Sequence, residues 1–69
     1  MNFTLAMTER IFSVNTDDGW CSVHVKDDGY TNYQSVEVYD QDGDYASTPV
    51  YNEVLEELKK QGILTGVLV

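Results

Sequence analysis

One stretch of the sequence, residues 48–62, carries the start, the apolar stripe and the stop of a helix. Thr48 is a preferred N-cap residue, because its hydroxyl can accept a hydrogen bond from a free amide of the first turn. Pro49 follows at the first helical position, where a missing N–H group is not needed. Gly62 suits the left-handed conformation that ends many helices. The pattern therefore predicts a helix over about residues 49–61.

This helix is amphipathic, so it needs a surface against which it can pack. Its apolar face has the spacing i, i+3, i+4 and i+7 and consists of Tyr51, Val54, Leu55 and Leu58. A single helix of about three to four turns is marginally stable by itself in water. The rest of the chain must therefore supply a sheet or further helices to cover this stripe.

The segment before the helix alternates apolar and polar residues, which is typical of strands that are buried on one face. The first strand begins at Phe3, and its alternation changes phase near Glu9 and Arg10. Since this step lacks the Gly, Asn or Asp of a tight turn, we expect one long strand with a bulge. Phe12 and Val14 carry the apolar positions after the bulge.

Two further strands are predicted over residues 20–26 and 35–40, separated by turns rich in Asp and Gly. The residues expected on their core faces are Cys21, Val23, Val25, Val36 and Val38. The turn before the second strand is predicted at residues 15–19. After the helix, residues 63–69 are almost wholly apolar and are expected to form a buried strand that closes the sheet.

Together these elements predict a single domain, residues 1–69, of the α+β class. We expect a small antiparallel β-meander of three strands, one amphipathic helix packed on the sheet, and a C-terminal strand, in the order β-β-β-α-β. A core of this size typically supplies a net stability of only about 3–5 kcal/mol. Association with a partner, or of two copies into a homodimer, would add to it.

Twelve acidic residues against four basic ones give the chain a formal charge of −8. Direct binding to nucleic acid or to an anionic membrane needs basic patches, so the charge argues against both. The same charge suits a protein that presents a negative surface to a basic partner. No apolar run reaches the roughly 20 residues of a membrane span. One Cys without a secretory signal predicts a reducing, cytoplasmic setting.

No motif in the sequence indicates catalysis, a metal site or a cofactor. Asp40, Asp42 and Asp44 form an acidic run, but its glycine and glutamate are out of register with an EF-hand loop. Acidic turns are also common for conformational reasons alone. Cys21 and His24 are three residues apart on a strand, which places them on opposite faces, and the chain has no second His. We therefore predict a non-enzymatic protein with no bound metal or cofactor.

The region between Tyr30 and Tyr51 carries the clearest functional signal. All five Tyr lie there, together with several acids and without any Lys or Arg. Tyrosine offers a large, rigid contact area at a low cost in entropy, and acids without basic neighbours should project a negative field. The predicted partner-binding residues are Glu37, Tyr39, Asp40, Asp42, Asp44 and Tyr45.

These features predict a small interaction protein that binds a basic protein surface. Carboxylates at i and i+2 of an extended segment are about 6.6–6.8 Å apart, so a row of them can occupy sites built for phosphates. Tyr rings can take the places of stacked bases, which would make the protein a nucleic-acid mimic. In being very small, acidic and poor in cysteine, the chain resembles phage-encoded inhibitors of bacterial defence, the anti-CRISPR and anti-restriction proteins. This resemblance implies a partner in the host cytoplasm such as a CRISPR effector or another nuclease.

An alternative interpretation is a structural or assembly subunit that oligomerises through a sheet edge or through the apolar C-terminal strand. The two interpretations differ in salt dependence, because electrostatic mimicry weakens as ionic strength rises and strand pairing tolerates salt. The acidic run leaves a calcium-regulated module as a third interpretation.

Overall fold

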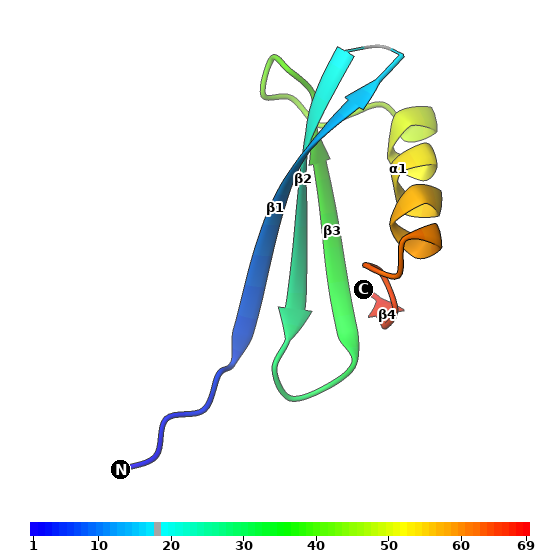
Figure 1. Ribbon diagram of the computed structural model, residues 1–69. Helices are drawn as coiled ribbons and strands as arrows, with labels where there is room; N and C mark the ends of the chain where they lie inside the picture. Colours follow the sequence, from blue (N-terminus) through cyan, green and yellow to red (C-terminus); the bar gives the residue numbers. More distant parts are fainter. Residues whose placement is uncertain (18) are drawn as a thin grey trace.

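The computed structural model describes residues 1–17 and 19–69. The elements follow one another as β1 (Met7–Thr16), β2 (Gly19–Asp28), β3 (Tyr33–Tyr39), α1 (Thr48–Lys60) and β4 (Val67–Leu68). The sheet order is β1-β2-β3-β4, with antiparallel pairing among the first three strands and parallel pairing between β3 and β4. Helix α1 packs on one face of this sheet, and the described chain places no second helix over the other face (Figure 1). The predicted α+β fold in the order β-β-β-α-β is confirmed.

The core lies between the sheet and α1. Successive side chains of a strand point to opposite faces, so alternate residues of β2 and β3 face the helix. The most deeply buried of these are Val23, Val25 and Val38. The whole buried cluster consists of Cys21, Val23, Val25, Val36, Val38, Val50, Val54, Leu58 and Leu64. The core faces predicted for the second and third strands are therefore confirmed.

Strand β1 pairs with β2 at every residue, so the bulge predicted near Arg10 is wrong. The alternation is in fact unbroken, because Arg10 takes an inward position in phase with Phe12 and Val14. The guanidinium of Arg10 is accommodated there because it donates a hydrogen bond of 3.0 Å to the carboxylate of Asp27. The apolar residues that indicated the other phase belong largely to residues 1–6, which precede the strand and are exposed.

Helix α1 begins one residue earlier than predicted, with Ser47 rather than Thr48 as its N-cap. The Ser47 side chain makes no capping hydrogen bond. At the other end Gly62 has the predicted positive φ, +72°, and the amide of Ile63 donates to the carbonyl of Leu58 at 2.9 Å. That contact turns the chain back toward the core. Among the described residues, no helix has both the length and the apolar character needed to cross a membrane.

The C-terminal segment differs from the buried strand predicted for residues 63–69. Only Val67 and Leu68 form a strand, and both are exposed at the edge of the sheet beside β3. Leu64 is the buried residue of this segment, and it contributes to the core before the strand begins. Apolar composition therefore does not predict burial in this segment. Val67 and Leu68 are apolar but exposed, because they lie in a short strand at the edge of the sheet.

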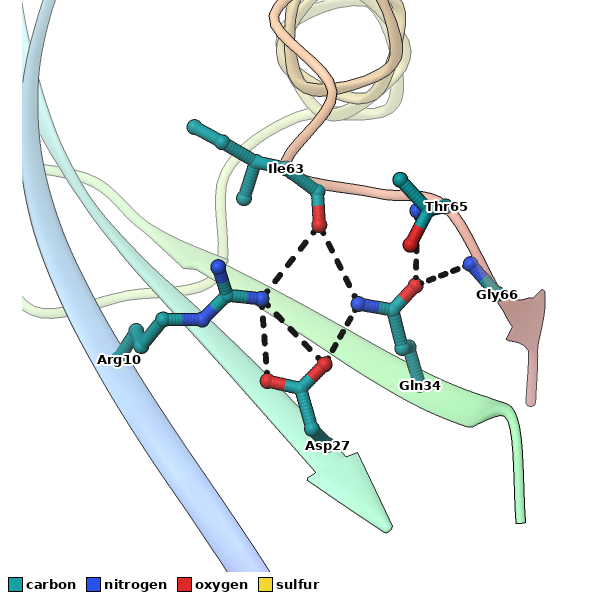
Figure 2. A network of polar contacts seen from close by, with 6 residues as sticks. All are labelled: Arg10, Asp27, Gln34, Ile63, Thr65 and Gly66. Atoms are coloured by element: carbon teal, nitrogen blue, oxygen red, sulfur yellow. Dashed lines mark hydrogen bonds and ion pairs between the residues drawn. The ribbon is translucent and has the colours of Figure 1, made fainter.

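A network of polar contacts holds this C-terminal segment against the sheet (Figure 2). Gln34 is only 5% exposed, and its side chain accepts hydrogen bonds from the amides of Thr65 and Gly66. The same side chain donates to Asp27 at 2.6 Å and to the carbonyl of Ile63 at 3.3 Å. All the polar atoms of the Gln34 side chain thus have partners, which is what its burial requires.

Candidate protein-binding surface

The face of the sheet opposite α1 carries three of the six residues predicted to bind a partner. Glu37 and Tyr39 point to this face from β3, as the alternation predicts, and Tyr45 reaches it from the segment that follows. The strand register places His24 of β2 opposite Glu37 and beside Ile11 of β1. Side chains from all three long strands therefore meet on one open surface.

A ladder of charges crosses this surface. Lys26 of β2 lies between Glu9 of β1 and Glu37 of β3, with N–O distances of 3.7 Å and 3.5 Å respectively. The prediction that Glu37 lacks a basic partner is therefore wrong. That prediction considered only neighbours in the sequence, whereas strand pairing brings Lys26 from eleven positions earlier in the chain. Glu37 contributes less to a negative field than its formal charge indicates.

Glu37 also accepts a hydrogen bond from the hydroxyl of Tyr39, two residues along the same strand. This hydrogen bond is the main cause that holds the pKa of Glu37 below its ordinary value, and the charge of Lys26 acts in the same direction. The pKa of Tyr39 is raised, because losing its proton would break the bond and place a second negative charge beside the carboxylate. The phenol of Tyr39 is thus fixed in position by an ionised neighbour.

Three rings meet around Tyr39. Tyr39 and Tyr45 stack with their centroids 5.1 Å apart and their planes 23° from parallel. His24 meets Tyr39 edge to face, also at 5.1 Å. Tyr45 remains 73% exposed in spite of this contact. We call His24, Tyr39 and Tyr45 the aromatic cluster; it offers a rigid apolar surface with polar edges.

The acidic run from Asp40 to Asp44 forms a turn beyond the end of β3, as its Asp and Gly residues indicate. One carboxylate oxygen of Asp40 accepts hydrogen bonds from the amides of Asp42 and Asp44 at 2.9 and 3.0 Å. Gly43 has a φ of +86°, which glycine adopts readily. Asp40 therefore stabilises the turn, and Asp42 and Asp44 are the exposed acids that the turn presents. An extended row with the spacing of phosphates is absent from this segment.

This turn lies at the same end of the sheet as the last residues of β1 and the first residues of β2 (Figure 1). The side chain of Gln41 approaches Gly19 so closely that a Cβ there would lie 2.7 Å from its Oε1 atom. Trp20, which is 47% exposed, lines a hollow of about 290 Å³ together with Asp40. Asp18, part of the predicted turn at residues 15–19, lies outside the described residues.

Charge is distributed unevenly along the molecule. The segments 11–25 and 38–58 contain no Lys or Arg. They include the larger parts of β1 and β2, the acidic turn and most of α1. The basic residues are Arg10, Lys26, Lys59 and Lys60, in the middle of the sheet and in the last turn of the helix. We call the turn at residues 40–44 and the adjacent connection at residue 17 the acidic end. The aromatic cluster lies directly beside it, through the bridge between Tyr39 and Tyr45.

The sequence prediction missed three residues of this surface. His24 and Trp20 share the strand face opposite Cys21 by their phase, but no pattern in the sequence links them to Tyr39 or to the acidic run. Lys26 was missed because the register between β2 and β3 is not encoded in any local pattern. The phase of Trp20, Ser22 and His24 is the one signal that points to this face.

The open sheet face carries stacked rings beside exposed carboxylates. Among the described residues, no group of three or more His, Cys, Asp or Glu side chains is arranged to hold a metal ion. The hydroxyl oxygen of Ser22 lies 3.1 Å from Nε2 of His24, within hydrogen-bond distance, on the open strand face. The hollow beside Trp20 and Asp40 is lined by polar and apolar side chains together. Stacked rings beside exposed carboxylates are suited to binding a cationic protein surface.

No protein-family model matches this chain, and searches of curated proteins and of solved structures find no significant match.

Proposed function

We propose that this chain is a non-enzymatic binding protein that presents its acidic end and the aromatic cluster beside it to a basic surface of another protein. The main support for this proposal is that the aromatic cluster lies directly beside the acidic turn. The exposed Tyr45 stacks on Tyr39 at the point where the chain leaves and re-enters the acidic turn. Rings of this kind act as anchors in interfaces, and nearby exposed charges steer the approach of a partner.

The arrangement is ordered before any partner binds, which supports this function. Tyr39 is held by its hydrogen bond to Glu37 and by two ring contacts. The turn that carries Asp42 and Asp44 is fixed by the carboxylate of Asp40. A preorganised surface binds more tightly because fewer side chains lose freedom on association.

In its finer form the proposal is that the partner is a protein groove that normally holds nucleic acid. The support is the net charge of −8, the absence of Lys and Arg from the acidic end, and the exposed ring of Tyr45 in the aromatic cluster. A nuclease or a CRISPR effector of the host cell is a partner with this chemistry, and the chain would then act as a phage-encoded inhibitor. The compact turn supplies clustered charge and not a regular phosphate spacing, so mimicry here rests on charge and stacking.

We further propose that the protein works in the cytoplasm. The support for this location is Cys21, a free thiol that is buried in the core and has the environment of a small apolar residue. Cytosolic proteins keep such thiols reduced.

The experiment is affinity capture from host lysate at low salt with matched variants. The test variant changes Asp42 and Asp44 to Asn, which removes two exposed charges and leaves the Asp40 hydrogen bonds in place. The control changes Glu56 and Glu57 to Gln, which removes the same charge from the exposed side of α1. We expect the wild type and the control to retain a protein that the test variant loses, and added heparin to release it. Equal capture by both variants would contradict the proposed surface.

A further inference from the structure

Strand β1 forms one edge of the sheet. It is ten residues long and pairs with β2 on one side, and no described strand lies on its other side. Its outer backbone N–H and C=O groups therefore have no strand partner in the described chain. Natural proteins usually shorten, charge, bend or cover a strand edge of this length, because it can pair with another chain.

The inner face of β1 is also incompletely covered. Phe12 and Val14 pack on the core but stay partly exposed, because α1 lies over β3 and not over β1 (Figure 1). A groove of about 340 Å³ runs between β1 and α1, with Val54 and Leu58 on its far wall. On the outer face of the strand, Ile11 is 61% exposed.

Both edges of the sheet carry little net charge, and β1 differs from β4 in its length, ten residues against two. Glu9 and Arg10 are the only charged residues of β1, and their charges cancel. Residues 11–16 carry no charge at all. The remainder of the chain therefore carries the whole net charge of −8. Two copies of so acidic a protein repel each other at most surfaces, and β1 is the long edge at which they do not.

We propose that the occupant of this edge is a second copy of the chain, paired through β1 in antiparallel orientation about a two-fold axis perpendicular to the sheet. Such an axis continues the sheet across the dimer and keeps both helices on the same face. The Phe12 and Val14 side chains of the two copies then lie next to each other and fill the space between the helices. With Phe12 opposite its own copy, Glu9 faces Asn15 and Arg10 faces Val14, so no like charges are opposed.

This arrangement also separates the charged parts of the two copies. Antiparallel pairing places the acidic end of one copy beside the Met7 end of its partner, so the two acidic ends lie far apart. Both aromatic clusters stay open on the outer face. The dimer is therefore compatible with the proposed binding function and does not depend on it.

The test is sedimentation equilibrium over a wide concentration range, with one lysine variant for each edge of the sheet. Ile11→Lys places a charge on the exposed outer face of β1, and Val69→Lys places the same charge on an exposed residue beside β4. We expect wild type and Val69→Lys to approach twice the 7.8 kDa of one chain. Ile11→Lys should raise the dissociation constant about tenfold or more, which corresponds to about 1.4 kcal/mol. Circular dichroism should show the same fold in all three proteins.

Two further measurements test the dimer: its dependence on salt and the hydrogen exchange of the strand amides. Added salt should strengthen the dimer, because it screens the repulsion between acidic copies, whereas it should weaken binding to a basic partner. Amides of β1 should exchange more slowly as the concentration rises, and those of β4 should not change. A protein that remains at 7.8 kDa throughout, or a dimer that only Val69→Lys disrupts, would overturn the proposal.

Discussion

At the scale of single residues, Tyr39 connects the parts of the proposed surface. Its hydroxyl bonds Glu37, its ring lies between His24 and Tyr45, and its neighbour in the chain is the aspartate that holds the acidic turn. Alternation along β3 was enough to predict that Glu37 and Tyr39 face outward. The contacts with Lys26 and His24 were not predictable, because they depend on how β2 and β3 are aligned.

The first prediction concerns the acid titration of Glu37. The hydrogen bond from Tyr39 is the main cause that lowers the pKa of Glu37 in the folded protein. The stability that ionised Glu37 contributes is therefore fully present above the ordinary glutamate pKa. It is lost as the pH falls through the lower pKa that Glu37 has in the folded state. Tyr39→Phe keeps the ring and removes the donor, and we expect it to raise the titration midpoint of Glu37. Carboxyl NMR shifts measure this, with Glu56 as the internal control. A midpoint that Tyr39→Phe leaves unchanged would show that the hydrogen bond is not the cause.

The second prediction concerns Gln34, whose side chain accepts hydrogen bonds from two amides of the C-terminal segment (Figure 2). Gln34→Leu fills a similar volume but removes the hydrogen bonds from the amides of Thr65 and Gly66, each of which contributes about 0.5–1.5 kcal/mol. We expect lower stability in denaturant and faster hydrogen exchange in residues 63–69. The matched change Gln61→Leu, at an exposed position, should alter stability by less than about 0.5 kcal/mol. Equal effects of the two changes would contradict the role given to Gln34.

At the scale of the elements, the signals that are local in sequence predicted the structure well. The helix was placed within one residue because a proline, an apolar stripe and a glycine all mark it. Strand β1 was predicted to contain a bulge because the apolar residues before Glu9 follow the other phase. Arg10 in fact faces inward, where its guanidinium bonds Asp27. Strand β4 was predicted to be buried because composition does not say whether a strand lies at an edge.

The third prediction tests the packing of α1 on the sheet. Leu58 is 5% exposed and lies in the buried cluster that includes Val36 and Val38. Leu58→Ala should lower the free energy of unfolding by about 2–5 kcal/mol. That loss is comparable to the whole net stability expected for so small a core, so the variant should unfold at much lower denaturant concentration. Glu56→Ala on the exposed side is the control, and a melting temperature of Leu58→Ala equal to that of this control would refute the packing.

At the scale of the whole molecule, the uneven distribution of charge is the main feature. One end of the sheet has acids and rings and no Lys or Arg, whereas the edge strand β1 is neutral overall. We propose a basic protein as the partner of the first surface and another copy of the chain as the partner of the second. Under the two proposals, salt should weaken binding at the first surface and strengthen association at the second, so the two can be measured separately in one protein.

The rates of binding to the captured partner, measured at low and at high salt, show whether the acidic end and the aromatic cluster form the interface. Changing Asp42 and Asp44 to Asn should slow association and flatten its salt dependence, because exposed charges act mainly on the rate of encounter. Tyr39→Ala should instead speed dissociation, as the loss of a packed aromatic anchor does. Changing both Glu56 and Glu57 to Gln should alter the association and dissociation rates much less. Unchanged rates in the Asn pair and in Tyr39→Ala would contradict the account and place the interface elsewhere.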